Sequence, residues 1–332
     1  VLGGTEAYIP DHAGNLQQVK WSGAAWVKTM VYDGPGILGA VAYGDFDQAH
    51  PGIEIVVGNR SGALTELYPN GAGGWVVTPM GGAGTQIWDL EVGNASSSHP
   101  GDEVWVGGKQ GTSGTRTWLV AGSGSSWVTT QILSAGLYLS IGDVDQDPGN
   151  EVAVLAPAGV YLLTGDGVAW TSTQISNLGA SWDQKSIVIA EFDADHAGPE
   201  IVYDRNLTNQ WAEVRELYRD GAGAWVSRLL YYSDADEPAW APTVHHFHMM
   251  AVCDADATRP GNEIVVPHSH VQHLPGRAVL VQVDAGVPSA SLMVQGWDEF
   301  HVAACGDLDP LSPGLEVLLA GHASEIVMLG QP

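Results

Sequence analysis

Three features of the sequence predict an all-β fold, a β-propeller with seven blades of four antiparallel strands, six blades being the alternative. A unit of about 48 residues recurs along the 332-residue chain. Each unit contains four short apolar stretches separated by turns that hold many of the 43 glycines. No stretch shows the long Lys/Glu/Leu pattern of a helix. Four short strands per unit with no helix between them are typical of propeller blades.

The repeat is clearest where "GDFDQAHPGIEIVVGNRSGALTELYPNGAGGWVVTPM", from Gly44, is set against "IGDVDQDPGNEVAVLAPAGVYLLTGDGVAWTSTQI", from Ile141. Each reads as an apolar strand, an acidic turn, Pro-Gly-x-Glu, a Val/Ile strand, a third strand and a Trp-led fourth strand. A Glu is expected to open every second strand, at Glu6, Glu54, Glu103, Glu151, Glu200, Glu263 and Glu316. The Trp recurs at Trp26, Trp75, Trp127, Trp170 and Trp225.

These positions predict a single domain over 1–332, with repeat units near 1–36, 37–85, 86–135, 136–183, 184–240, 241–297 and 298–332. The first unit starts at its second strand and the last lacks a fourth. Either a strand from one end completes the blade at the other, or the natural chain continues beyond this sequence.

The acidic segments Asp45-Phe-Asp47, Asp143-Val-Asp145, Asp254-Ala-Asp256 and Asp307-Leu-Asp309 each precede the Glu of a second strand. This pattern, which covers nearly the whole chain, resembles the FG-GAP or VCBS-type propeller repeat. The resemblance implies the fold but says little about function, because propellers include enzymes, lectins and docking proteins.

Relatives with a fuller Asp-rich loop bind calcium there, so the resemblance implies calcium as a possible cofactor. The candidate ligands are Asp143, Asp145, Asp147, Asp193 and Asp195. Most units have lost the third acidic position, however. We therefore expect the first Asp of most turns to be structural, accepting backbone N–H bonds that hold the turn.

The charge balance limits the partners. Lys and Arg together number 12 against 38 Asp and Glu, a formal net charge of -26. Such a chain repels a phosphate backbone, so nucleic acid is not expected as a partner. No apolar run reaches the roughly 18 residues of a membrane span. Acidity and low Lys content favour a secreted or periplasmic location, and nothing in the sequence indicates an oligomeric state.

The only cysteines are Cys253 and Cys305, in neighbouring units. Alignment sets Cys253 against Gly306, which leaves Cys305 one position out of register and facing the other side of its strand. We therefore predict two small buried apolar residues rather than a disulfide.

Two histidine groups, "VHHFHMM" (244–250) and "PHSHVQH" (267–273), follow one another closely. In propellers the starts of first strands and the ends of second strands meet on one face, and the acidic turns lie on the other. This polarity places both histidine groups on the same face as four of the twelve basic residues. The longer step from Glu200 to Glu263 adds loop to that face, where repeat proteins usually build binding walls.

Five histidines are candidate ligands for a transition metal, Zn or Mn: His246, His248, His268, His270 and His301. Two alternatives remain open. The histidines can be ordinary polar groups that line a wet channel, or they can act as catalysts without a metal.

The leading hypothesis is a metal-dependent lyase or dehydratase that performs β-elimination or enolisation on a carbohydrate or other small anionic ligand. The metal would polarise a carbonyl or carboxylate, and a nearby side chain would move the proton. The candidate catalytic residues are Tyr138, His245, Arg60, Lys109 and Arg205. The candidate substrate-binding residues are Trp88, Lys185, Trp240 and His322.

Two other functions compete with this hypothesis. One is a non-catalytic, lectin-like carbohydrate-binding propeller, and the other is a protein-interaction propeller in a larger secreted protein. For Arg60 and Arg205 the structural alternative is a pairing with local acids such as Asp204.

Overall fold

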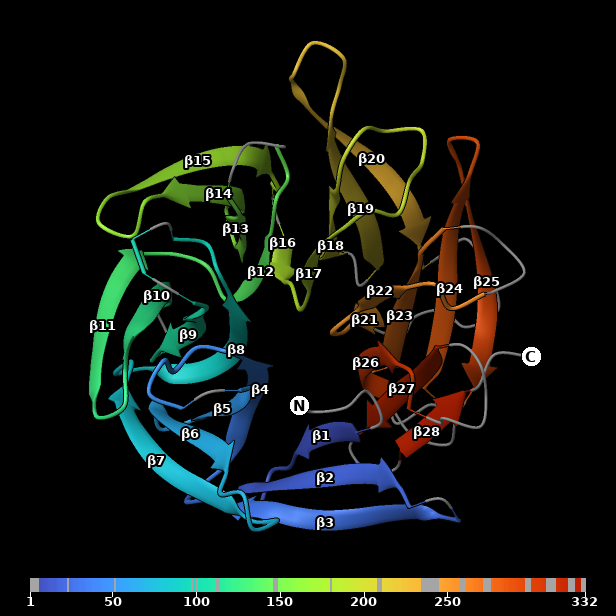
Figure 1. Ribbon diagram of the computed structural model, residues 1–332. Coiled ribbons are helices and arrows are strands. Elements are labelled where there is room, and N and C mark those ends of the chain that lie inside the picture. Colours follow the sequence, from blue (N-terminus) through green and yellow to red (C-terminus); the bar gives the residue numbers. More distant parts are fainter. Residues whose placement is uncertain are drawn as a thin grey trace. The chain divides into compact units, whose positions relative to one another are not determined.

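The computed structural model of the chain contains seven antiparallel sheets, the blades of a β-propeller, and no helix among the residues that it describes (Figure 1). The seven-bladed all-β prediction is confirmed. The described residues are 6–22, 24–50, 52–96, 98–99, 101–111, 114–145, 149–179, 181–207, 211–233, 245–256, 261–270, 276–295, 300–308, 315–321 and 326–329. None of the described segments forms a helix long and apolar enough to cross a membrane.

Blades 1 to 4 follow the chain order of their strands. Blade 1 has three strands, β1 (Glu6–Pro10), β2 (Asn15–Trp21) and β3 (Trp26–Asp33). Blade 2 has β4 (Leu38–Gly44), β5 (Glu54–Asn59), β6 (Ala63–Pro69) and β7 (Trp75–Gly82). Blade 3 has β8 (Gln86–Gly93), β9 (Glu103–Gln110), β10 (Gly114–Ser123) and β11 (Ser126–Leu133). Blade 4 has β12 (Tyr138–Gly142), β13 (Glu151–Ala156), β14 (Gly159–Gly165) and β15 (Trp170–Asn177).

In blades 5 and 6 the first strand is broken into two short pieces that pair with the same second strand. Blade 5 has β16 (Ser181–Asp183), β17 (Ile187–Ala190), β18 (Glu200–Leu207), β19 (Ala212–Arg219) and β20 (Trp225–Tyr232). Blade 6 has β21 (His245–Phe247), β22 (Ala251–Cys253), β23 (Glu263–His270), β24 (Arg277–Asp284) and β25 (Val287–Gln295). Blade 7 has three strands, β26 (Phe300–Gly306), β27 (Glu316–Gly321) and β28 (Ile326–Leu329).

The break in blade 5 moves a predicted boundary. β16 pairs with the end of β18, so blade 5 begins before residue 184, where the repeat predicted its start. The interruption has a local cause, because Asp204 Oδ1 accepts the backbone N–H groups of Lys185 and Ser186, at 2.7 Å each. Because a side chain accepts these two amides, they are not part of the hydrogen-bond ladder between the first and second strands.

The chain divides into two compact units, and the division passes through blade 4. Unit 1 comprises Val1–Ile141, Asp147–Ala156 and Leu162–Thr173, and unit 2 comprises Gly142–Gln146, Pro157–Tyr161 and Gln174–Pro332. Each has its own apolar core between neighbouring sheets. In unit 1 Val56, Ile87 and Val104 are fully buried between blades 2 and 3. In unit 2 Val202 and Phe247 are fully buried between blades 5 and 6. The single domain over 1–332 stays a prediction.

The predicted Glu opens the second strand in all seven blades. Its carboxylate accepts backbone N–H groups from the acidic turn: Glu54 Oε2 is 3.1 Å from the Phe46 nitrogen, and Glu263 Oε2 is 2.8 Å from the Ala255 nitrogen. The same bond recurs in Glu103, Glu200 and Glu316. The Glu that starts the second strand therefore helps to hold the acidic turn. In blade 4 the first Asp does so as well, because Asp143 Oδ1 accepts the backbone N–H of Asp145 at 3.3 Å. For the other turns this role of the first Asp stays a prediction.

The two cysteines form a disulfide, which corrects the sequence prediction. Cys253 pairs with Glu263 and Gly306 with Glu316, so the one-position offset of Cys305 is real. The prediction was wrong because it treated the two cysteines as if their strands lay in one sheet. β22 and β26 belong to blades that pack face to face, so the surfaces that meet are opposite sides of the two sheets. An offset of one position turns the two side chains toward each other.

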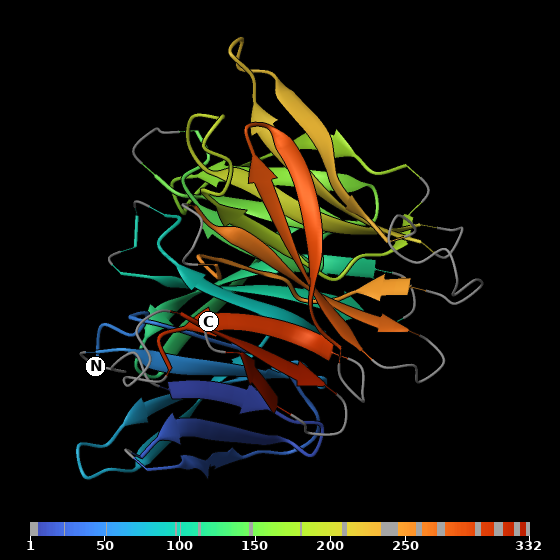
Figure 2. The ribbon, with the colours of Figure 1, turned by 90° about the vertical axis from the view of Figure 1, so that its right-hand side faces the viewer.

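The outer hairpins of blades 5 and 6 lie side by side in unit 2 (Figure 2). Arg228 in β20 donates from Nη1 to the carbonyl oxygen of Gly286, at the tip of the β24–β25 hairpin, at 3.2 Å. A side chain from one blade therefore reaches across to the next, and its position is fixed from both sheets.

Candidate functional site

Four of the predicted site residues come together in unit 1. Arg60 follows β5, and its guanidinium carbon lies 3.2 Å from the centre of the Trp88 ring in β8. Lys109 Nζ lies 6.0 Å from the same ring, and Tyr138, at the start of β12, interacts electrostatically with Arg60. These four residues, named here the Arg60 cluster, come from three consecutive blades. The strand polarity that predicted their convergence is confirmed for them.

The local backbone explains how the Arg60 cluster forms. The β8–β9 ladder shifts register between Ile87 and Asp89, which takes Trp88 out of the regular pairing. Gly39 lets the chains approach, because a Cβ at that position would lie only 2.0 Å from the Ile87 carbonyl oxygen. The side chain of Asp89 is buried and accepts the backbone N–H of Leu139 at 2.7 Å, which ties β8 to β12.

The Arg60 cluster contains two buried hydrogen-bond donors that lack acceptors in the described part of the chain. Arg60 Nη1 and Trp88 Nε1 are both buried and form no hydrogen bond with the described residues. Burial lowers the pKa of Arg60, and Tyr138 opposes that shift. Burial raises the pKa of Asp89 to about 7, although its two backbone hydrogen bonds favour the charged form. Two donors without acceptors make a site that favours an acceptor-rich or anionic ligand.

In unit 2 three histidines of the predicted metal site have described side chains, His248, His268 and His301. The rings of His248 and His301 meet edge to face with centres 4.1 Å apart, joining blades 6 and 7. His268 is fully buried and packs on Phe247, with ring centres 5.1 Å apart. The β21–β23 ladder sets His245 opposite His270 and His246 opposite Ser269, and the side chains of these four residues lie outside the description. A metal held by the five histidines stays a prediction.

The other predicted site residues fall in different places. Arg205 pairs with Glu213, Nη1 to Oε2 at 3.6 Å, so the structural alternative of a local acid partner holds, with Glu213 in place of Asp204. Lys185 is half-buried and its backbone N–H is bonded to Asp204. Three candidates lie outside the described residues: Asp147, Trp240 and His322.

The calcium candidates occupy the acidic turns of blades 4 and 5. Asp143 Oδ1 accepts the backbone N–H of Asp145 at 3.3 Å, and Asp145 pairs with Arg219 at the same distance. Asp193 is buried and contacts the guanidinium of Arg228, whereas Asp195 is exposed. The protein itself therefore supplies positive charge to Asp145 and Asp193. Calcium at these turns stays a prediction.

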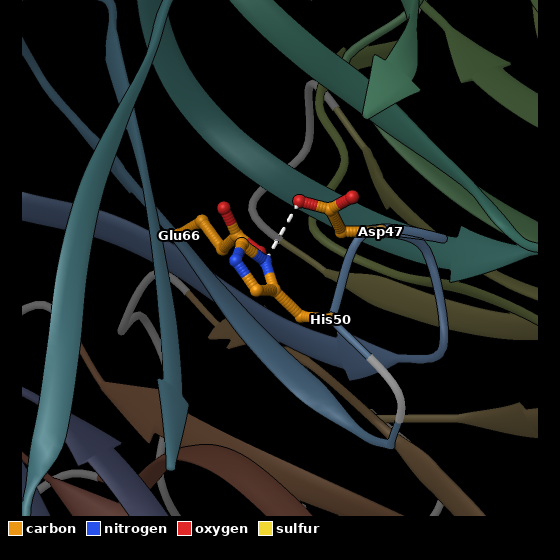
Figure 3. A group of neighbouring side chains, drawn as sticks. All are labelled: Asp47, His50 and Glu66. Atoms are coloured by element: carbon orange, nitrogen blue, oxygen red, sulfur yellow. Dashed lines mark hydrogen bonds and ion pairs between the residues drawn. The ribbon is translucent and has the colours of Figure 1, made fainter. Parts of the chain in front are cut away.

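Sequence reasoning missed a histidine–carboxylate group that occurs twice. In blade 2 it consists of Asp47, His50 and Glu66, whose side chains point toward one another (Figure 3). In blade 5 it consists of Asp193, His196 and Glu216. The signal was present in the repeat, because blades 2 and 5 share Phe-Asp-x-x-His in the turn and Glu-Leu-Tyr in the third strand.

The buried second-strand glutamates make stability depend on pH. Burial raises the pKa of Glu54, Glu103 and Glu200 to about 7, against about 4.3 in an unfolded chain. Between these values the folded protein binds more protons than the unfolded chain, so stability falls as the pH rises through this window. We expect the Tm to be higher at pH 5 than at pH 8 in scanning calorimetry.

The matched control for this pH dependence is the double variant E54Q/E200Q, which removes two of the titrating groups and should flatten the Tm profile. A wild-type Tm that is constant or rises over pH 5 to 8 would show that these carboxyls titrate normally in the fold.

No family model matches the sequence, and no curated protein matches it. Solved β-propellers do match the structure. A lectin from Burkholderia pseudomallei, BP39L, has a TM-score of 0.61 at 15% identity, with 97% of this chain and 90% of the lectin covered. BBS1N, solved in complex with ARL6DN, has a TM-score of 0.58 at 14% identity, covering 100% of this chain and 89% of that one. The WD40 propeller of Doa1 has a TM-score of 0.54 at 12% identity, covering 99% and 90%. At these identities the likeness shows the propeller fold alone, and the FG-GAP or VCBS resemblance is not confirmed at the family level.

Proposed function

We propose that the protein is a non-catalytic binding propeller that recognises an acidic carbohydrate at the Arg60 cluster. The observation that carries this proposal is the pair of buried donors, Arg60 Nη1 and Trp88 Nε1, that form no hydrogen bond with the described residues. Leaving such donors buried and unpaired costs free energy that a bound carboxylate would recover.

The chemistry of the cluster fits a uronic acid better than a simple inorganic anion. A guanidinium can bind a carboxylate through two parallel hydrogen bonds, and the indole N–H adds a donor for a hydroxyl or ring oxygen. Lys109 is exposed at the edge of the cluster, where it attracts an anionic ligand despite the negative net charge of the protein. One of the similar propellers is a lectin, which supports this use of the fold.

A lyase or dehydratase reaction needs more than this cluster provides. Tyr138 is available near Arg60 as a proton-transfer group, but it is buried. Among the histidines with described side chains, His248 and His301 are in contact, whereas His268 packs on Phe247. The binding function therefore has the stronger support, and the enzyme remains the second candidate.

The test is calorimetric titration with oligogalacturonate, using a neutral oligosaccharide of equal length as the reference ligand. Arg60→Ala should weaken binding about thirtyfold, because a charge-assisted hydrogen bond contributes about 2 kcal/mol. Arg205→Ala is the matched control, since Arg205 is paired with Glu213 and should leave the affinity unchanged. Equal binding of the acidic and neutral oligomers, or no effect of Arg60→Ala, would refute the proposal.

The same titration separates binding from catalysis. Incubation of wild-type protein with oligogalacturonate should leave the ligand intact. Ultraviolet absorbance from an unsaturated uronate product would instead establish β-elimination and return the lyase to first place.

We also propose that the protein works outside the cytoplasm, in a secreted or periplasmic setting. The Cys253–Cys305 disulfide supports this, because such bonds persist in oxidising compartments and are rare in the cytosol.

A further inference from the structure

The group in blade 2 has the composition and spacing of a metal site. His50 Nδ1 lies 2.9 Å from Asp47 Oδ2 and 3.1 Å from Glu66 Oε1 (Figure 3). Three ligands of a tetrahedral zinc ion with bonds of about 2.0–2.1 Å are separated by about 3.3 Å. Both distances from His50 Nδ1 are therefore within a few tenths of an ångström of the separation that one shared cation requires, and all three ligand atoms lie within 4.8 Å of one another.

The three side chains are held in place by their surroundings. Both oxygens of the Asp47 carboxylate accept the backbone N–H of Gly124, at 2.9 Å each. Oδ1 also accepts the backbone N–H of Ala49, at 2.8 Å. The His50 ring stacks on Tyr68, with centres 3.6 Å apart. Such supporting contacts are what orients the ligands in known metal sites.

One atom in the group has no partner. The side chain of Glu66 is fully buried, and its Oε2 forms no hydrogen bond with the described residues. Asp47 is equally buried, so two buried carboxylates share the site with a single imidazole. Nearby positive charge stabilises the ionised form of such a buried carboxylate pair.

Blade 5 shows where that positive charge belongs. Asp193, His196 and Glu216 repeat the group, with His196 Nδ1 at 3.2 Å from each carboxylate. There, Arg228 Nε donates to Glu216 Oε2 at 2.7 Å, and the guanidinium also contacts Asp193. Glu216 pairs with Arg228 in the β19–β20 ladder, and in the β6–β7 ladder of blade 2 the equivalent pair is Glu66 and Thr78. Blade 2 therefore keeps the acids and the histidine but lacks the guanidinium.

We propose that Asp47, His50 and Glu66 bind a divalent transition metal ion, such as Zn²⁺, that takes the place held by the guanidinium of Arg228 in blade 5. One imidazole nitrogen and two carboxylate oxygens are a donor set that such an ion accepts, and its charge balances the two acids. His50 is 26% exposed, which gives solvent, and hence a water ligand, access to the open coordination position. This site lies at the acidic-turn end of β5, at the opposite end of the strand from Arg60, and does not depend on the carbohydrate proposal.

The experiment is equilibrium dialysis of the full chain, stripped with chelator, against Zn²⁺, with metal content measured at each free concentration. Histidines elsewhere can bind zinc, so the site is defined by variants. Thr78→Arg places a guanidinium opposite Glu66, as in blade 5, and should weaken binding at this site at least a hundredfold without loss of fold. His50→Gln should do the same. His99→Gln is the matched control, because His99 lies in the equivalent turn of blade 3 with one carboxylate, Glu103, at 3.9 Å, and binding should be unchanged.

The converse variant tests the same idea from blade 5. Arg228→Thr should create a second zinc site and raise the stoichiometry by one per chain. Near-ultraviolet circular dichroism checks that each variant is folded, and His50→Gln keeps the test valid if either arginine exchange misfolds. Zinc binding that survives both Thr78→Arg and His50→Gln, or wild-type protein with no site tighter than millimolar, would overturn the proposal.

Discussion

Replacing Cys253 and Cys305 together with alanine is expected to lower the free energy of unfolding by about 4 kcal/mol. The disulfide closes a loop between residues 52 positions apart, and a cross-link of that span restricts the unfolded chain by about this amount. It joins β22 to β26, the first strands of two neighbouring blades whose apolar surfaces form one core cluster. Denaturant titration of the oxidised wild type and of the double variant measures the difference.

Wild-type protein in the presence of reductant is the control for this experiment, and it should unfold at the same denaturant concentration as the alanine variant. If oxidised and reduced wild type unfold together, the two blades are held by packing alone and the disulfide does not stabilise the fold.

Replacing Arg228 with methionine is expected to destabilise the metal-free protein by about 3 kcal/mol at neutral pH, the low end for a broken buried ion pair because the guanidinium retains some solvent exposure. Methionine keeps the length of the side chain but leaves Asp193 and Glu216 buried beside each other. Burial already raises the pKa of Glu216, and Arg228 opposes that shift. Loss of the guanidinium should raise this pKa further, so the variant should regain stability as the pH falls toward 5.

Arg215→Met is the matched control for Arg228→Met. Arg215 pairs with Glu213 in a partly exposed position on β19, and such pairs contribute at most about 1 kcal/mol. Chemical denaturation of both variants at pH 7 and pH 5 gives the comparison. A variant at Arg228 that is no less stable than the one at Arg215 would show that the guanidinium of Arg228 does not stabilise the carboxyl pair of blade 5.

The fold was predictable because its signals are local. The Glu that opens each second strand and the Trp near the start of the fourth recur with the period of a blade, and a strand pattern of this kind needs no knowledge of distant contacts. That Arg60 and Trp88 lie on the same face was also predictable, since it follows from strand polarity, but their direct contact was not predicted.

What the sequence did not reveal depends on which surfaces meet between sheets. If β22 and β26 lay in one sheet, the offset of Cys305 would point the two cysteines to opposite faces and exclude a disulfide. Because the strands belong to two sheets that face each other, the same offset points the two cysteines toward each other. In the same way Glu66 lies 16 residues beyond His50, on a different strand, and the lack of a guanidinium there is visible only when blades 2 and 5 are superposed. Residue spacing shows the motif that the two blades share, but not that its three side chains meet.

The glutamate that accepts main-chain amides of the acidic turn in blades 2, 3, 5, 6 and 7 has a consequence for how the repeats diverge. Because this Glu binds backbone N–H groups rather than side chains of the turn, the backbone of the turn depends little on which side chains most of its positions carry. Mutation can then exchange Asp for Asn or Ser there, as in Asn94 and Ser96 of blade 3, while the blade survives. One conserved support within each repeat thus gives the loops room to evolve separate tasks.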